Sequence, residues 1–246
     1  MDRSVYVAMT GATQIMRAQE AVSHNLANAS TVGFKSQLSA FQSVPVLGDG
    51  TPARINAVAH GIGQSNAQGS PVNTGRSLDI SVRGSGFIAV QSPDGSEGYT
   101  RAGDLQLTAD GGLTDSRGNP VMGSSGPISI PPATDISVGS DGTISTVPQG
   151  QGPNSVSQID RIKLVNPDVA QMTQGQDGLM HMSDGSTAAS DDTVSIASGE
   201  LEGSNVNPSA ELVKMIALSR QYDMQVKSIK TSEDNADSSI KLLQAN

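Results

Sequence analysis

Apolar positions near the N-terminus follow a helical period. Residues 3–29 contain no proline, one glycine and a series of mostly apolar positions spaced alternately three and four apart. The series is Val5, Ala8, Ala12, Ile15, Gln19, Val22, Leu26 and Ala29. This alternation puts the series on one narrow stripe of a helix and is typical of a coiled-coil seam. It predicts an N-terminal helix with one apolar stripe.

The C-terminal segment repeats the same pattern. Its series is Leu212, Met215, Ser219, Tyr222, Val226, Ile229, Glu233, Ala236, Ile240 and Leu243. Asn207 and Pro208 precede it and supply a capping side chain followed by a residue suited to the first helical turn. A second helix with one apolar stripe is therefore expected from this point to the end of the chain.

Between these segments the period changes from helical to strand-like. Short apolar runs alternate with polar residues, as in Leu78, Ile80 and Val82. Asp-Gly pairs, which favour tight hairpin turns, interrupt the stretch at residues 94–95, 110–111, 141–142, 177–178 and 184–185. Residues 76–200 are therefore predicted to form short antiparallel strands. Residues 35–75 are rich in Gly, Pro, Gln and Asn and keep no period, which predicts an extended connector with a strand or two.

These segments together predict an α+β fold. The N- and C-terminal helices pair as a coiled-coil-like unit, with an inserted all-β domain and an extended connector. The expected domains are an N-terminal helix and its adjoining motif (1–34), the connector (35–75), the β domain (76–200) and the C-terminal helix (201–246).

Composition narrows the function. The chain has no Cys, no Trp, three His and 2% aromatic residues, so the usual catalytic side chains are scarce. The three histidines, His24, His60 and His181, form no helical pair, and no metal site or cofactor is expected. A net charge of −9 argues against nucleic acid and an anionic membrane surface as partners. The N-terminal apolar run, Val5 to Met9, is too short for a secretory signal, and no segment is long enough to insert into a membrane.

The two apolar stripes are thin. Ala8, Ala12, Gln19, Ser219 and Glu233 contribute little burial, so an isolated pair of such helices would be marginal against the entropy of ordering them. This favours a protein that completes its fold on assembly. From the pattern alone, the alternative that the stripes are core-facing helices of a monomer remains open.

Two long motifs carry a family resemblance. The first is Asn25-Leu26-Ala27-Asn28-Ala29-Ser30-Thr31-Val32-Gly33-Phe34-Lys35, and the second is Leu201-Glu202-Gly203-Ser204-Asn205-Val206-Asn207 followed by Glu211-Leu212, Met215-Ile216, Arg220 and Tyr222. A third stretch, Gly98-Tyr99-Thr100-Arg101-Ala102-Gly103, lies between them. All three resemble the flagellar rod and hook axial proteins. The likeness covers essentially the whole chain and is greatest to the proximal rod members, with the distal rod members as the near alternative. Pro208 departs from the pattern, because many relatives have a helix-favouring residue there.

The resemblance implies a non-enzymatic subunit of the flagellar basal-body rod. Such a subunit is exported by the flagellar type III apparatus without a cleaved signal and assembles with copies of itself and with other rod proteins into a tube that crosses the periplasm. The terminal helices would line that tube. The residues expected at the assembly interface are Val5, Ile15, Val22, Leu26, Asn28, Thr31, Gly33, Phe34, Leu212, Met215, Tyr222, Val226, Ile229, Ile240 and Leu243.

Two other functions stay open at this point. A hydrolase acting on peptidoglycan would need two acids in a cleft with aromatic platforms, and the low aromatic content argues against it. A monomeric secreted binding module would keep its terminal segments protected from proteolysis in dilute solution, whereas an assembly subunit would have them trimmed first.

Overall fold

The computed structural model describes residues 3–45, 55–152 and 155–244. The chain forms two compact units. The helical unit contains Met1–Ala29, Ser36–Ser65 and Val206–Asn246, and the β unit contains Ser30–Lys35 and Asn66–Asn205. Each is described by itself below.

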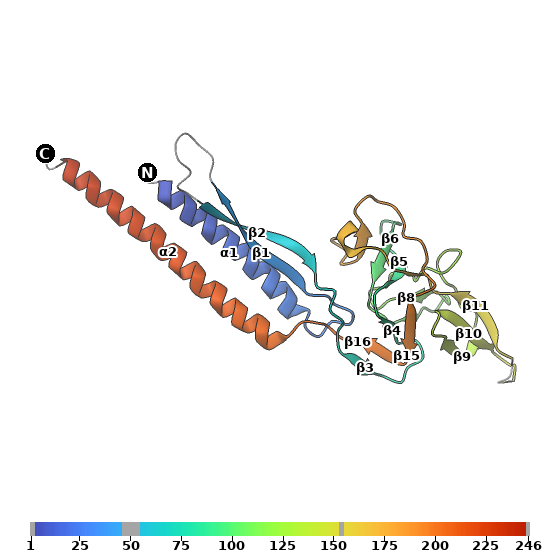
Figure 1. The fold of residues 1–246 in the computed structure, drawn as a ribbon. Coiled ribbons are helices and arrows are strands. Elements are labelled where there is room, and N and C mark those ends of the chain that lie inside the picture. The colour runs from blue at the N-terminus through green and yellow to red at the C-terminus, as the bar shows by residue number, and fades with distance from the viewer. Residues whose placement is uncertain (1–2, 46–54, 153–154, 245–246) are drawn as a thin grey trace. The chain divides into compact units, whose positions relative to one another are not determined.

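The helical unit consists of two antiparallel helices and a hairpin (Figure 1). Helix α1 spans Arg3–Ala27 and helix α2 spans Pro208–Gln244. The start of α2 is capped as expected, because Asn207 Oδ1 accepts a hydrogen bond from Ala210 N at 3.1 Å. Strands β1 (Gln37–Pro45) and β2 (Ile55–Gln64) pair antiparallel and lie along α1.

The two helices bury a small core. It contains Ile15, Ala18, Val22 and Leu218, with Met215 and Tyr222 packed against it. The buried and half-buried positions of α2 are Glu211, Met215, Leu218, Tyr222, Gln225, Ile229, Ser232 and Ala236. Every second position of the expected series is thus replaced by the residue just before it. Leu218, and not Ser219, therefore lies in the core between the helices. The small residues of α1 set this rotation, since Gln225 packs closely over Gly11.

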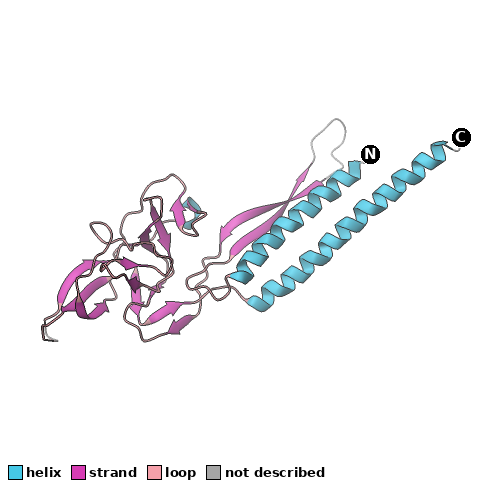
Figure 2. Cartoon of the chain, turned by 180° about the vertical axis from the view of Figure 1, so that it is seen from behind, coloured by secondary structure: helices cyan, strands magenta, loops and turns pink. Residues whose placement is uncertain are grey.

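The predicted fold class, an α+β fold with an inserted all-β domain and an extended connector, is wrong. The described residues form one helix at each end and sixteen strands between them, so the chain is β-rich (Figure 2). The expected connector is largely a hairpin, in which Gln37 pairs with Gln64 and Pro45 with Ile55. Its composition hid it, because small residues and glycines replace the large side chains that usually mark a strand.

Buried polar side chains of α1 hold this hairpin in place. Asn25 Oδ1 accepts a hydrogen bond from Gln37 N at 2.8 Å, and Asn25 Nδ2 donates to Gln37 O at 3.0 Å. About three turns earlier in the same helix, Gln14 Oε1 accepts a hydrogen bond from Ala59 N at 3.0 Å. Backbone groups of both strands are therefore satisfied by side chains of the helix.

The β unit contains the remaining strands. They are β3 (Pro71–Asn73), β4 (Ile80–Arg83), β5 (Phe87–Gln91), β6 (Glu97–Thr100), β7 (Gln106–Leu107), β8 (Leu113–Thr114), β9 (Ala133–Val138), β10 (Thr143–Pro148), β11 (Ser157–Arg161), β12 (Leu164–Val165), β13 (Met172–Gln174), β14 (Met180–Met182), β15 (Ser195–Ser198) and β16 (Glu200–Glu202), with a short 3-10 helix at Val169–Gln171. All pairings are antiparallel, and the largest sheet has the order β12-β5-β6-β14-β13. A three-stranded sheet, β11-β10-β9, and pairs β15-β4, β16-β3 and β7-β8 complete it.

The predicted Asp-Gly turns are present in the β unit. The glycine of each of the five pairs has a positive φ, between 73° and 88°. In three of them the aspartate also accepts hydrogen bonds from the backbone N–H and the hydroxyl two residues later. These pairs are Asp94 with Ser96, Asp141 with Thr143, and Asp184 with Ser186. The side chains thus fix the turns that separate the strands.

Candidate functional site

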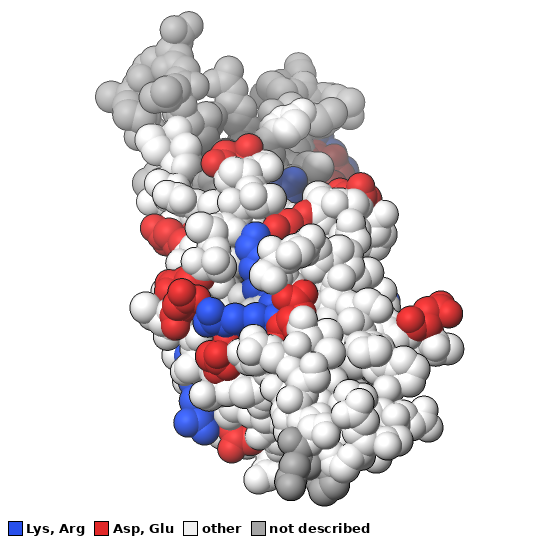
Figure 3. Space-filling model, turned by 90° about the vertical axis from the view of Figure 1, so that its right-hand side faces the viewer, with Lys and Arg blue, Asp and Glu red and all other residues white. Residues whose placement is uncertain are grey.

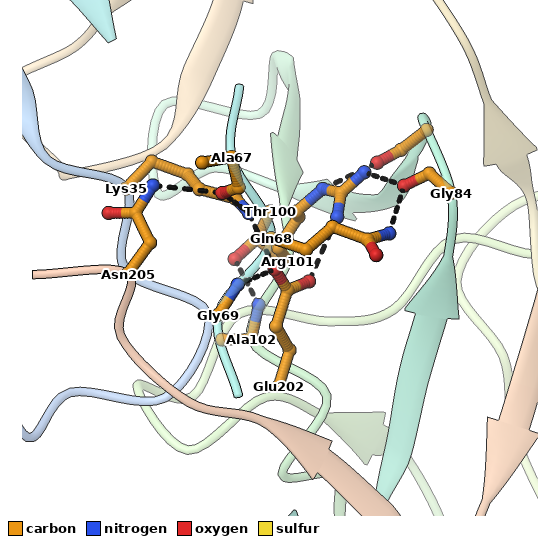
Figure 4. A network of polar contacts seen from close by, with 11 residues as sticks. Lys35, Ala67, Gln68, Gly69, Gly84, Thr100, Arg101, Ala102, Glu202 and Asn205 are labelled. Atoms are coloured by element: carbon orange, nitrogen blue, oxygen red, sulfur yellow. Dashed lines mark hydrogen bonds and ion pairs between the residues drawn. The ribbon is translucent and has the colours of Figure 1, made fainter. Parts of the chain in front are cut away.

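A buried cluster of three charged side chains lies in the β unit (Figure 4). Glu202 is its centre: Oε1 lies 2.5 Å from Lys35 Nζ, and Oε2 lies 2.9 Å from Arg101 Nη1. Gly69 N also donates to Glu202 Oε1 at 2.9 Å. The three side chains are 4–8% exposed. We call Lys35, Arg101 and Glu202 the charge cluster.

The cluster joins chain segments that are far apart in sequence. Lys35 Nζ donates to Ala67 O at 2.7 Å, and Asn205 Nδ2 donates to the same oxygen at 2.9 Å. Gly33 N donates to Glu202 O at 2.7 Å. Gly33 has φ 66°, and a Cβ there would lie 2.4 Å from the backbone of Arg101 and its neighbour. Only glycine permits this close approach of the two segments.

Arg101 is fixed on its other side by the backbone. Its Nε donates to Gly86 O at 3.0 Å and its Nη2 to Gly84 O at 2.5 Å. The guanidinium lies 5.5 Å from the centre of the Phe87 ring, within range of a cation–π interaction. The planar donor set of arginine is thereby divided between one carboxylate and two carbonyls.

Burial and ion pairing act in opposite directions on the pKa values of Lys35 and Glu202. Burial lowers the pKa of Lys35, although the hydrogen bond and the charge of Glu202 oppose the shift. Burial alone would raise the pKa of Glu202, but the hydrogen bonds from Lys35 and Gly69 and the two nearby cations outweigh it and lower the pKa. A buried carboxylate that already accepts three hydrogen bonds cannot reach a substrate. The cluster is a structural junction and not an acid–base site.

A second polar group contains a serine, a histidine and an aspartate, the residue types of a hydrolase triad, but they are hydrogen-bonded in a different order. Ser92 Oγ donates to Asp177 Oδ2 at 2.7 Å, and His181 Nε2 lies 3.0 Å from the same oxygen. His181 Nδ1 lies 3.2 Å from Glu97 O. The serine is thus bonded to the acid and not to the imidazole, so no base is placed to take its proton. Burial would raise the pKa of Asp177, but hydrogen bonds from Ser92, Leu179 N and His181 lower it.

The predicted interface residues lie in three kinds of surroundings. Ile15, Val22 and Phe34 are buried, and Leu212, Val226 and Ile240 are 46–51% exposed. Those of intermediate exposure are Val5, Leu26, Asn28, Thr31, Gly33, Met215, Tyr222 and Ile229. The side chain of Leu243 lies outside the described residues. The structure brings Ile15, Val22, Met215 and Tyr222 into one cluster, whereas Gly33 and Phe34 belong to the β unit.

Each helix of the helical unit also exposes apolar side chains. On α1, the exposed positions Tyr6, Met9, Thr13 and Met16 again alternate three and four apart, and we call them the outer stripe. The exposed apolar residues of α2 are Leu212, Val213, Ile216, Met224, Val226 and Ile240. Large side chains of this kind on two sides of one helix pair are typical of surfaces that contact other chains.

Most of the basic side chains in the described part of the β unit lie beside an acidic one. Arg161 lies 2.6 Å from Asp192, and Lys163 lies 2.8 Å from Glu97, beside a groove of about 610 Å³. On the face drawn in Figure 3, basic side chains likewise lie next to acidic ones. Across the described ranges, no group of three or more His, Asp or Glu residues is arranged to hold a metal ion. No helix within those ranges is long and apolar enough to cross a membrane.

Comparison with known proteins decides the family. Residues 5–35 match the model of the flagella basal body rod protein, residues 81–146 that of the flagellar hook protein FlgE/F/G D1 domain, and residues 197–242 that of the flagellar basal body rod FlgEFG protein C-terminal. The flagellar basal-body rod protein FlgF of Escherichia coli K12 is 41% identical over 99% of both chains. The chain belongs to the flagellar basal-body rod protein family.

Two further rod proteins support the assignment. FlgF of Salmonella typhimurium is 39% identical over 99% of both chains. The rod protein FlgG of Buchnera aphidicola from Acyrthosiphon pisum is 32% identical over 94% of this chain and 95% of its own. The chain is therefore a FlgF-like member of the rod family.

The three matched rod-family segments meet in the charge cluster. Lys35 is the last residue of the first segment, Arg101 lies within the second, and Glu202 lies within the third. Lys35, Arg101 and Glu202 all stand within the motifs that carry the family resemblance, but their contact was not predicted. A charged residue inside each of three family motifs was the available signal, because a buried charge requires a partner of opposite sign.

Proposed function

We propose that this chain is a structural subunit of the bacterial flagellar basal-body rod, of the FlgF-like proximal kind, and polymerises into the helical shaft that transmits torque. The observation that carries the proposal is the family match at both ends and in the middle of the chain, together with apolar side chains exposed on both terminal helices. A distal, FlgG-like subunit is the second candidate. The higher identity to FlgF favours the first.

Torque can pass through this subunit without any chemical step. The chain passes between the two units after residues 29, 35, 65 and 205, so four covalent connections join them. Lys35, Ala67 and Asn205 lie at or next to three of these connections and are linked by hydrogen bonds at the charge cluster. A load applied to the helical unit enters the β unit through segments that are fastened to one another. Packed, incompressible contacts then carry it to the next subunit.

The remaining features of the proposal follow the rod family. The chain is exported by the flagellar type III apparatus without a cleaved signal and lies in the rod where it crosses the periplasm. Its partners are copies of itself and the neighbouring proximal and distal rod subunits, it needs no cofactor, and it is not an enzyme. The terminal segments 1–34 and 201–246 provide assembly contacts, residues 35–75 join them to the rest, and residues 76–200 form the outer β domain. The fifteen predicted interface residues remain part of this proposal.

Purified basal bodies test the proposal. The gene is deleted in its own cells, and a tagged copy is returned on a plasmid. We expect loss of motility on deletion, recovery on complementation, and the tagged chain in detergent-purified basal bodies by mass spectrometry. Motile deletion cells, or a chain found only outside the basal bodies, would overturn it.

A further inference from the structure

A small pocket of about 260 Å³ opens in the helical unit between α1, the start of β1 and the first turns of α2. Its walls are mostly small or apolar side chains. They include Ala21, Val22, Leu38, Phe41 and Leu218. Glu211 and Lys214, from the first two turns of α2, supply the charged part of the lining. No function described above uses this pocket.

Glu211 is the unusual member of the lining. It is 5% exposed, and its Oε1 lies 2.6 Å from Lys214 Nζ. Its Oε2 is also buried but accepts no hydrogen bond from the described residues. A buried carboxylate oxygen without a donor costs free energy, so it calls for a donor from outside. The Lys214 side chain that pairs with the other carboxylate oxygen is itself mostly exposed.

We propose that the pocket receives the Tyr6 side chain of a second copy of this chain, with the phenol hydroxyl donating to Glu211 Oε2. The inference rests on the proposed function and names one contact within that assembly. The apolar walls suit an aromatic ring, and Lys214 already balances the carboxylate, so a neutral donor fits better than another cation.

Tyr6 is the tyrosine available for this role. Tyr99 is fully buried, and its oxygen accepts a hydrogen bond from Ala188 N. Tyr222 packs against the core between the helices. Tyr6 is 59% exposed and stands at the head of the outer stripe, followed by Met9 and Met16. Those methionines would continue the contact along the neighbouring copy.

The contact cannot form within one chain. At 1.5 Å per residue of helix, Tyr6 lies about 22 Å from Ala21 on the same rigid α1. Each copy therefore presents a tyrosine near one end of α1 and a receiving pocket near the other. Contacts between unlike surfaces of this kind produce an open polymer rather than a closed dimer.

Cysteine crosslinking tests the contact, because the native chain has no cysteine. Met9→Cys and Ala21→Cys are combined in one chain with Tyr6 unchanged, and cells or purified basal bodies are treated with a short bis-maleimide. The two thiols lie about 18 Å apart along their own helix, beyond the reach of the reagent. We expect a ladder of crosslinked multimers. The matched control pairs Met9→Cys with Glu20→Cys, where Glu20 is the exposed neighbour of Ala21 and should give no ladder.

Substitutions at the two bonding groups separate this contact from general assembly. In the Met9→Cys/Ala21→Cys background, Tyr6→Phe should lower the crosslinked fraction about tenfold, and Tyr6→Ala more. Once Glu211→Leu has removed the acceptor, Tyr6→Phe should cause no further loss.

The outcomes distinguish this inference from the proposed function. Basal bodies that contain the double-cysteine chain but yield no ladder would overturn the tyrosine contact and leave the rod function standing. A crosslink to a different subunit, or equal effects of Tyr6→Phe with and without Glu211, would also overturn it. Absence of the native chain from basal bodies would instead contradict the rod function itself.

Discussion

Glu202 is the common counterion of two buried cations in the β unit. It separates two buried cations that would otherwise face each other without compensation. Glu202→Gln keeps the shape and removes the charge, so Lys35 and Arg101 lose their common counterion. We expect the free energy of unfolding of the β unit to fall by about 3–5 kcal/mol. Urea titration followed by near-ultraviolet circular dichroism, where buried Tyr99 reports, measures the loss.

Glu200→Gln is the control for this substitution. Glu200 lies in the same strand, β16, but is half-exposed, and its change should stay within about 0.5 kcal/mol. Equal stability of the two variants would show that the buried charges contribute little.

Acid should remove the stabilisation that ionised Glu202 gives to the β unit. The pKa of Glu202 is lowered from 4.5 in the folded chain, since the hydrogen bonds and cations outweigh burial. The unfolded chain therefore binds the proton more readily. The stabilisation is complete above about pH 4.5 and is lost as pH falls through the lower folded value. Urea midpoints measured between about pH 6 and pH 3 should fall, and Glu202→Gln should fall less steeply. Parallel curves for the two chains would contradict this.

At the scale of elements, the hairpin depends on α1 through hydrogen bonds more than through apolar packing. Most β1 side chains are exposed, whereas Asn25 satisfies both backbone groups of Gln37. Asn25→Ala should remove both hydrogen bonds and cost about 1–3 kcal/mol, which would be measured as faster amide hydrogen exchange in β1 and β2. Ser23→Ala, at an exposed position of the same helix, should leave exchange unchanged.

The two faces of α2 should separate folding from assembly. Leu218 is 9% exposed in the core between the helices, so Leu218→Ala should cost about 2–5 kcal/mol in the monomer. Leu212 is 47% exposed, so Leu212→Asp should leave the monomer stable but prevent incorporation into the rod. Circular dichroism of the monomer and recovery in basal bodies provide the two measurements. Normal incorporation of Leu212→Asp would count against this face as an interface.

At the scale of the whole molecule, α2 is longer than its partner. It has 37 residues against 25 in α1, a difference of about 18 Å at 1.5 Å per residue. Its last turns, with Ile240 exposed, gain little packing within one chain. We expect fast amide exchange there in dilute monomer and strong protection in rods. Protection that is already complete in the monomer would contradict the idea that assembly orders this end.

The sequence predicts some parts of the molecule better than others, for physical reasons. Periodicity locates both helices, because apolar spacing directly reflects helical geometry. It misses the rotation that buries Leu218 in place of Ser219, since small residues on the opposite helix decide that contact. The strand or two predicted within residues 35–75 falls on β1 and β2, but their pairing as a hairpin was missed. Side-chain hydrogen bonds from Gln14 and Asn25 hold these strands, and no apolar pattern marks such bonds.

The candidate site was predictable only in part. The motifs containing Lys35, Arg101 and Glu202 were visible in the sequence. Their contact depends on how the chain folds between Lys35 and Glu202, which are 167 positions apart. The outer stripe was also present in the sequence, as Tyr6, Met9, Thr13 and Met16. A longer series with the same spacing lies on the same helix, and one apolar stripe is enough for a helix in a monomer.

The wide separation of Lys35 and Glu202 along the chain has a consequence for when the β unit can fold during the proposed export. A polypeptide that emerges with its N-terminus first exposes Lys35 long before Glu202 follows. Until then, the lysine has no counterion and the surrounding segments gain nothing by closing around it. In the proposed N-terminus-first export, the β unit would therefore close only after its last strand, β16, has emerged.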